Sequence, residues 1–188
     1  YAFDECYSLR SIVIPDGVTS IGDHAFDSCK SLTDIVIPDS VTSIGLAVFC
    51  GCISLSSLVI SNVVISIGND AFYECYSLTS INIPSSVTSI GDSAFFECSS
   101  LTSINIPSSV TSIGSYAFMR CTKLSNIELP KKLNNIGNST FYNCDELASI
   151  VIPKTVITVG ESAFGNCDNL KTVEFEDGTY AVIGSGYE

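Results

Sequence analysis

Cysteine is the residue type whose number and spacing most readily suggest chemistry in this sequence. The chain of 188 residues contains nine cysteines, and eight of them recur at intervals of 23 residues. These eight are Cys6, Cys29, Cys52, Cys75, Cys98, Cys121, Cys144 and Cys167. A ladder of thiols could form disulfides or bind a metal ion, and Cys50, which lies outside the ladder, could be a reactive thiol. The elements that carry the ladder decide between these chemistries.

Motifs typical of enzymes do not accompany the cysteines. The single histidine, His24, has no positioned nucleophile beside it, and the sequence contains no G-x-S-x-G elbow, Gly-rich phosphate loop or EF-hand spacing. Cys50-Gly51-Cys52 lacks a second Cys or His pair at zinc spacing. We therefore expect no enzymatic activity, no cofactor and no metal site.

The period of the cysteines is shared by phenylalanine, leucine and proline. Phenylalanine recurs at Phe3, Phe26, Phe49, Phe72, Phe95, Phe118, Phe141 and Phe164, and leucine at Leu9, Leu32, Leu55, Leu78, Leu101, Leu124, Leu147 and Leu170. All six prolines occupy one phase of the repeat. We expect residues 1–188 to form a single array of about eight repeats, cut from a longer protein.

The alternation within one repeat predicts a short strand over residues 101–106. Apolar residues at Leu101, Ile104 and Ile106 alternate with polar ones, and Pro107, which lacks an N–H group, ends the hydrogen-bonded ladder. One such strand cannot bury its apolar face alone, so neighbouring repeats must stack into a solenoid with core columns of Phe, Cys, Leu and Ile.

The rest of the repeat predicts a corner and a helical turn. Gly91 and Gly114 suit a tight corner with positive φ. Residue types that favour a helix N-cap follow, such as Asp92, and a helical turn would carry Phe95 and Cys98 inward.

Strand spacing argues against a disulfide ladder. Adjacent strands lie about 4.8 Å apart, whereas the Cβ atoms of a disulfide lie about 3.8 Å apart. Buried, reduced thiols are therefore favoured for the eight periodic cysteines. Cys50 is expected to be the one exposed thiol, able to form an intermolecular disulfide.

The pattern L-x-x-I-x-I-P-x-x-V-x-x-I-G-x-x-A-F-x-x-C resembles the 23-residue leucine-rich repeats of the BspA-like family. The resemblance covers Tyr1 to Gly184, with departures at Ser61, which replaces a proline, and at an extra residue that precedes Gly184 in the last copy. It implies a right-handed superhelix with a concave parallel β-sheet and short helical turns on the convex side. Family members are bacterial or protist surface proteins of the adhesin type, which implies localisation at the cell surface or secretion.

Charge and hydropathy exclude several classes of partner. Eight basic against 20 acidic residues give a formal net charge of −12, which disfavours nucleic acid and anionic lipid. The longest apolar runs are far shorter than the roughly 20 residues that span a bilayer, so we expect no direct membrane insertion.

Two columns of outward residues are candidate binding surfaces. The strand position between the two inward isoleucines is occupied by Val13, Val36, Val59, Asn82, Asn105, Glu128, Val151 and Glu174. On the expected fold this column is the middle of the concave face, where it could bind a partner. The alternative is that valine occupies these positions only because it favours strand formation.

The second column follows each core phenylalanine. Its largest members are Tyr73, Phe96, Met119 and Tyr142. They form either an exposed aromatic stripe or a set of side chains that fold back over the edge of the core.

These observations favour a non-enzymatic module that binds a host or neighbouring-cell surface or matrix protein. The alternative is a structural repeat that self-associates by end-to-end stacking, because neither end shows a clear cap. Binding of ice or polysaccharide by a threonine column is weaker, because Ile65 and Asn134 interrupt that column.

Overall fold

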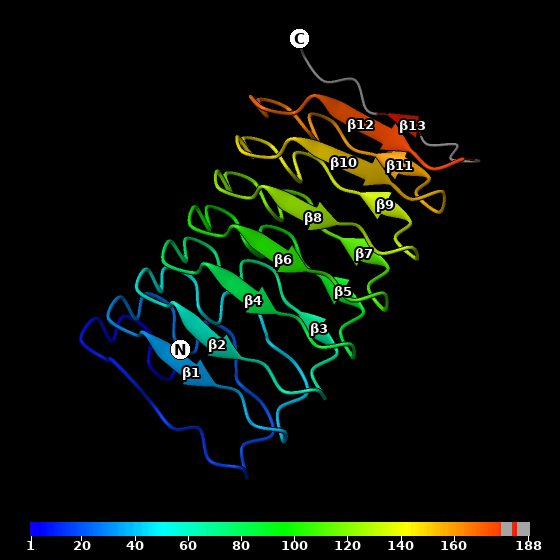
Figure 1. The fold of residues 1–188 in the computed structure, drawn as a ribbon. Helices are drawn as coiled ribbons and strands as arrows, with labels where there is room; N and C mark the ends of the chain where they lie inside the picture. The colour runs from blue at the N-terminus through cyan, green and yellow to red at the C-terminus, as the bar shows by residue number, and fades with distance from the viewer. Residues whose placement is uncertain (178–181, 184–188) are drawn as a thin grey trace.

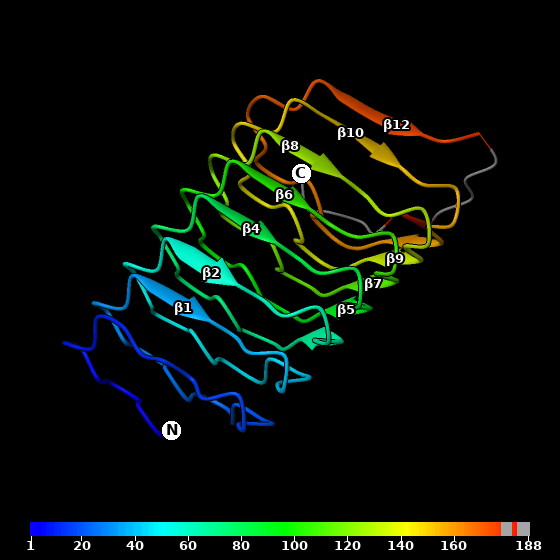
Figure 2. The ribbon, with the colours of Figure 1, turned by 60° about the horizontal axis from the view of Figure 1, so that its bottom comes forward.

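Two rows of short parallel strands run along the structure, a computed structural model that describes residues 1–177 and 182–183 (Figure 1). The first row contains β1 (Asp34–Val36), β2 (Ser57–Val59), β4 (Ser80–Asn82), β6 (Ser103–Asn105), β8 (Asn126–Glu128), β10 (Ser149–Ile152) and β12 (Thr172–Phe175). The second row contains β3 (Ser66–Ile67), β5 (Ser89–Ile90), β7 (Ser112–Ile113), β9 (Asn135–Ile136), β11 (Thr158–Val159) and β13 (Val182–Ile183). The two rows lie on opposite sides of the interior (Figure 2).

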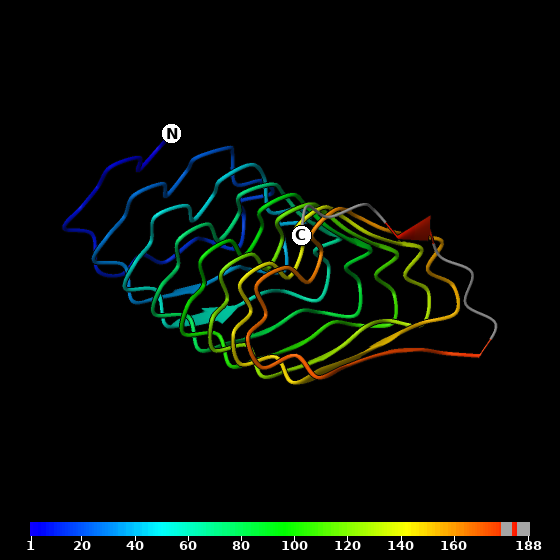
Figure 3. The same ribbon diagram turned by 90° about the horizontal axis from the view of Figure 1, so that it is seen from above.

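Each repeat makes one turn of a solenoid, and successive turns overlap when viewed from above (Figure 3). The chain register follows the sequence period: Ser80 pairs with Ser103 and Ser103 with Asn126, all parallel. In the last repeat Thr158 pairs with Val182, one residue later than the period gives, which places the predicted extra residue before β13. Gly184, before which the sequence predicts the extra residue, lies outside the described residues.

The predicted core columns are confirmed. The periodic Phe, Cys and Leu side chains from the third to the seventh repeat are fully buried. The isoleucines of both strand rows in these repeats are at most 7% exposed. The phenylalanine rings stack along the solenoid, for example Phe72 on Phe95 with ring centroids 5.2 Å apart. Burial of one phenylalanine per repeat makes this column a major source of hydrophobic stabilisation.

The short helices expected on the convex side are not seen among the described residues. Two residues in each repeat after the first have left-handed backbone conformations there, such as Ser93 (φ 51°) and Glu97 (φ 55°), which is incompatible with a right-handed helix. Alternate N–H groups instead donate to the next repeat: the Phe95 N–H donates to the Ala117 carbonyl and the Glu97 N–H to the Met119 carbonyl. We call this segment, from the repeat's glycine to its cysteine, the turn face.

The glycines at the start of the turn face allow close approach, and the expectation of positive φ at Gly91 and Gly114 was wrong. A Cβ atom at Gly114 would lie 2.4 Å from the Asp92 side chain and 2.6 Å from the Gly91 carbonyl carbon, whereas neither glycine has a left-handed backbone. Only the absence of a side chain lets adjacent repeats pack so closely at this corner.

The residues expected to cap helices cap the neighbouring repeat instead. The Asn69 side-chain oxygen accepts the Asp92 N–H at 2.9 Å, and the Asp92 carboxylate accepts the Ser115 N–H at 2.8 Å. Asn138 does the same for Glu161 at 2.9 Å. A residue type suited to a helix N-cap therefore serves here to satisfy a donor one turn further along the solenoid.

Candidate protein-binding surfaces

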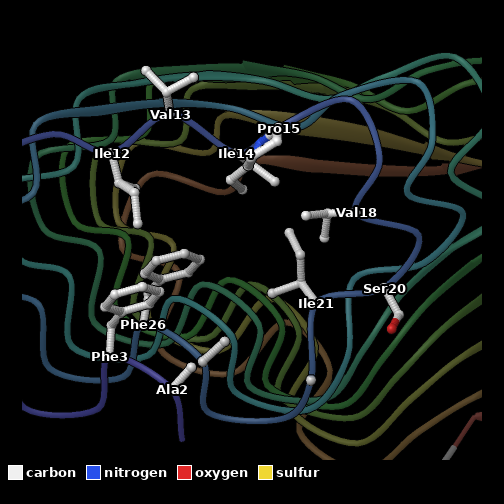
Figure 4. A pocket seen from close by; sticks show the side chains of 12 residues that line it. Ala2, Phe3, Ile12, Val13, Ile14, Pro15, Val18, Ser20, Ile21 and Phe26 are labelled. Atoms are coloured by element: carbon white, nitrogen blue, oxygen red, sulfur yellow. The ribbon is translucent and has the colours of Figure 1, made fainter.

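The outward side of the first row of strands, which we call the strand face, presents the valine column to solvent. The alternation of the strands places one residue outward between two inward isoleucines, and Figure 4 shows Val13 on the opposite side of the backbone from Ile12 and Ile14. Val13 is 89% exposed, Val36 60% and Val59 56%. Asn82, Asn105 and Glu128, the next members, are exposed as well.

The N-terminal part of the strand face is hollowed. A hollow of about 570 Å³ is lined by Val13, Val36 and Val59, with carboxylates at its margins. Those carboxylates belong to Asp16, Asp34 and Asp39. This hollow combines an apolar floor with an acidic margin.

The C-terminal part of the strand face carries two further hollows of different chemistry. One, of about 440 Å³, is lined by residues that include Glu128, Lys131 and Val151. The other, of about 400 Å³, is lined by Asn105 together with Glu128 and Lys131. Both signs of charge border these hollows, so the strand face changes along its length from apolar and acidic to polar and mixed.

The second candidate surface is only partly exposed. The aromatic stripe also covers the edge of the core, because all four of its members are half-buried: Tyr73, Phe96, Met119 and Tyr142. Tyr73 stacks on Phe96 with centroids 4.5 Å apart, and the Tyr142 hydroxyl accepts a hydrogen bond from the Asn166 amide at 2.7 Å. Burial raises the pKa of the Tyr73 hydroxyl above its ordinary value.

Cys50 is half-buried, and the expectation that it is the one exposed thiol was wrong. Burial, followed by the nearby Asp27 carboxylate, raises the pKa of Cys50 to about 12, so its thiol is neutral at physiological pH. Cys6, in the first repeat, is exposed instead. All nine cysteines are free thiols in the structure.

The single histidine lies beside an aromatic ring and a carboxylate. His24 stacks on Tyr1 with centroids 4.8 Å apart, and its Nδ1 lies 2.9 Å from an Asp27 carboxylate oxygen. Within residues 1–177 and 182–183, no group of three or more His, Cys, Asp or Glu side chains converges as a metal site would require. The described part of the chain also contains no helix long and apolar enough to span a bilayer.

The charged margins of the strand face are functional candidates that the sequence reasoning missed. The aspartates of these margins were considered there only for the net charge of the chain and for the absence of an EF-hand spacing. The signal was present in the alternation, because Asp34 lies two residues before Val36 and therefore points to the same side of the strand. Lys131 similarly follows the proline that ends its strand, at the position where Asp16 and Asp39 lie in earlier repeats.

A solenoid with two rows of short parallel strands, a buried Phe–Cys–Leu core and a non-helical turn face defines the chain as a leucine-rich repeat protein. A family model described as the BspA type leucine-rich repeat region, with six copies, matches residues 1–99 and 65–186. The chain belongs to this family, as its repeat pattern predicts.

Solved structures of bacterial proteins show the same fold. The T. pallidum leucine-rich repeat protein TpLRR is 30% identical over 86% of this chain and 78% of its own, with a TM-score of 0.80. A leucine-rich repeat protein of Bacteroides ovatus is 32% identical over 98% of this chain, with a TM-score of 0.74. This chain spans 54% of the length of the Bacteroides protein.

A leucine-rich cell surface protein of Faecalibacterium prausnitzii is 27% identical over 93% of this chain and 75% of its own, with a TM-score of 0.43. The comparison with curated proteins found no match.

Proposed function

We propose that this chain is a non-enzymatic protein-binding module of a cell-surface or secreted protein, which binds host or neighbouring-cell proteins through its strand face. The observation that carries the proposal is the hollowed row of outward side chains on that face, which begins with Val13, Val36 and Val59. Apolar side chains that cluster at a hollowed surface are typical of binding sites.

The way the repeats stack supports recognition by a rigid surface. Backbone hydrogen bonds and buried columns link each repeat to the next, so the strands are ordered before a partner arrives. Little conformational entropy is then lost on binding, which leaves more of the contact free energy for affinity.

The half-buried aromatic stripe of Tyr73, Phe96, Met119 and Tyr142 is the competing surface on the same module. Two variants separate the surfaces. The strand-face variant combines Val36→Asn with Val59→Asn, because asparagine occupies this column at Asn82 and Asn105 and is compatible with the strand. The stripe variant combines Tyr73→Ser, Phe96→Ser and Tyr142→Ser.

Binding of both variants to a panel of purified extracellular matrix and cell-surface proteins tests the proposal, with thermal unfolding as the control for folding. We expect the strand-face variant to lose binding to whichever panel member the wild type binds, and the stripe variant to retain it. Loss of binding in the stripe variant alone would show that the partner binds the turn face. Unchanged binding by both variants would overturn the proposal for either surface.

The second candidate function is end-to-end self-association of the repeat array. Side chains of the first two repeats, Phe3, Phe26, Val18 and Ile21, point into an apolar hollow of about 340 Å³ (Figure 4). Another repeat of the same kind fits this surface, since each internal repeat covers the same side chains of its neighbour. Size-exclusion chromatography with light scattering tests this function: growth in mass with concentration supports stacking, and a constant monomer mass contradicts it.

A further inference from the structure

We infer that the N-terminal hollow of the strand face binds a partner segment that places lysine or arginine side chains beside apolar ones. This inference rests on the proposed function and specifies the chemistry of the partner. Its basis is the combination of an apolar floor and a carboxylate margin within one hollow, formed by the first three repeats.

The floor is an apolar strip that crosses adjacent repeats. Val36 and Val59 are directly paired in register between β1 and β2, so their side chains are one strand spacing apart, about 4.8 Å. Val13 extends the strip by one repeat. More than half of each of these side chains is exposed, which leaves apolar surface for a partner to cover.

Carboxylates lie on both sides of this strip. Asp34 points outward from the same strand as Val36, about 7 Å before it. Asp39 follows Pro38 at the other end of the strand and lines the same hollow, as does Asp16 one repeat earlier. One Asp34 oxygen accepts a hydrogen bond from the Thr33 hydroxyl at 2.8 Å, which leaves the other oxygen to a partner.

No cation of this chain lines the hollow among the described residues. The ion pairs that those residues form join His24 to Asp27 and Arg120 to Glu97, and neither involves a carboxylate of the margin. A partner that supplied the cations would therefore not have to displace an existing ion pair.

Lysine and arginine fit this arrangement because each has an apolar stem and a charged end. The stem can lie along the valines while the charged end reaches a carboxylate at the margin. A purely apolar segment would remove water from the carboxylates without replacing it, and an acidic segment would be repelled. The net charge of −12 further attracts a basic partner during encounter.

The preference belongs to this end of the array. In the C-terminal hollows Glu128 faces the same space as Lys131, so those hollows offer no single sign of charge. The partner segment is consequently expected to lie with its basic part over β1 and β2.

Two synthetic peptides with the same apolar residues, one carrying lysines and the other glutamates, test the inference with the full chain. We expect the lysine peptide to bind more tightly than the glutamate peptide, and to bind more weakly as salt rises from about 0.05 to 0.5 M. The double variant Asp34→Asn, Asp39→Asn should weaken binding of the lysine peptide about fivefold, because two exposed charge pairs are lost and each contributes modestly. The control Glu146→Gln, Asp168→Asn removes the same charge from exposed positions elsewhere and should leave the affinity unchanged.

The outcomes separate this inference from the proposed function. Equal affinity for the two peptides, or equal weakening by the margin variant and its control, overturns the inference. If the strand-face variant Val36→Asn, Val59→Asn still abolishes binding of a panel protein in that case, the proposed function stands while the chemistry assigned to the partner fails. If it has no effect on any panel protein, the proposed function fails independently.

Discussion

The thiol sulfur of Cys98 lies 3.2 Å from the backbone carbonyl oxygen of Phe72, one repeat earlier in the solenoid. The same carbonyl accepts the N–H of Cys75 within its own repeat, at 3.3 Å. Equivalent thiol contacts join Cys75 to Phe49, Cys121 to Phe95 and Cys144 to Phe118. The periodic cysteine is thus a small apolar side chain that also donates a hydrogen bond between repeats, and this role accounts for the ladder without disulfides or metal.

Replacing Cys98 by alanine should lower the free energy of unfolding by about 1–2 kcal/mol. The variant loses a fully buried sulfur and leaves a small cavity beside the Phe72 carbonyl. Denaturant unfolding measures the effect. Cys6→Ala is the matched control, because Cys6 is exposed, and its change should stay within about 0.5 kcal/mol. Equal losses in the two variants would contradict the structural role of the thiol contact.

Thiol-reactive reagents should modify the cysteines in order of exposure. Cys6 should react first, and Cys50 slowly, because at pH 8 a thiol with a pKa of about 12 is ionised in only about one molecule in ten thousand. Since ionisation increases as pH approaches the pKa, the Cys50 rate should rise about tenfold per pH unit between about pH 8 and 10. Peptide mapping by mass spectrometry follows both sites, and a Cys50 rate that is flat over this interval would refute the raised pKa.

Gly114→Ala should destabilise the fold by at least about 2 kcal/mol. The new methyl group would lie 2.5 Å from the Asp92 backbone nitrogen, so the two repeats would have to move apart. Gly22→Ala is the control at the equivalent position of the first repeat, where no atom lies within 4 Å of the added Cβ. Thermal unfolding of both variants gives the comparison, and comparable melting temperatures would mean that close stacking does not require glycine.

Asp92→Ala should cost about 1 kcal/mol, because it leaves the Ser115 N–H without its acceptor. Asp92→Asn retains a side-chain oxygen at that place, as Asn69 and Asn138 do in neighbouring repeats, and should be nearly neutral. Denaturant unfolding of both variants distinguishes loss of the hydrogen bond from loss of the charge. A penalty of the same size in Asp92→Asn would show that charge, and not capping, matters here.

The sequence predicted the solenoid because its information is periodic. Each residue of the Phe, Cys and Leu columns has the same environment in every internal repeat, so repetition reveals burial even though a single copy would be ambiguous. The outward valine column followed from the alternation within the strand in the same way.

The turn face could not be predicted from the same pattern. Ser93 and Glu97 do not favour the left-handed conformation, and it is the hydrogen bonds to Ser115 and Met119 of the next repeat that support it. The second row of strands, such as β7, was also missed, because two residues are too few to show an alternation. Both features arise from contacts between repeats, which local propensity does not contain.

The hollow at Val36 likewise depends on neighbours. Val36 and Asp34 could each be assigned to the outer surface from the sequence, but their assembly with Asp39 and Val59 into one hollow required the three-dimensional arrangement. The candidate site was therefore predicted as a column of residues, without the charged margin that gives it chemical character.

Hydroxyl-radical footprinting of the complex with the panel protein that binds most tightly tests the central claim most directly, since it reports side-chain exposure on both faces at once. Binding through the strand face predicts that oxidation of Val13, Val36 and Val59 falls in the complex, while Tyr116 on the turn face, which is 43% exposed, reacts as it does in the free protein. Protection of Tyr116, Tyr73 and Phe96 with unchanged oxidation of the three valines would contradict the account.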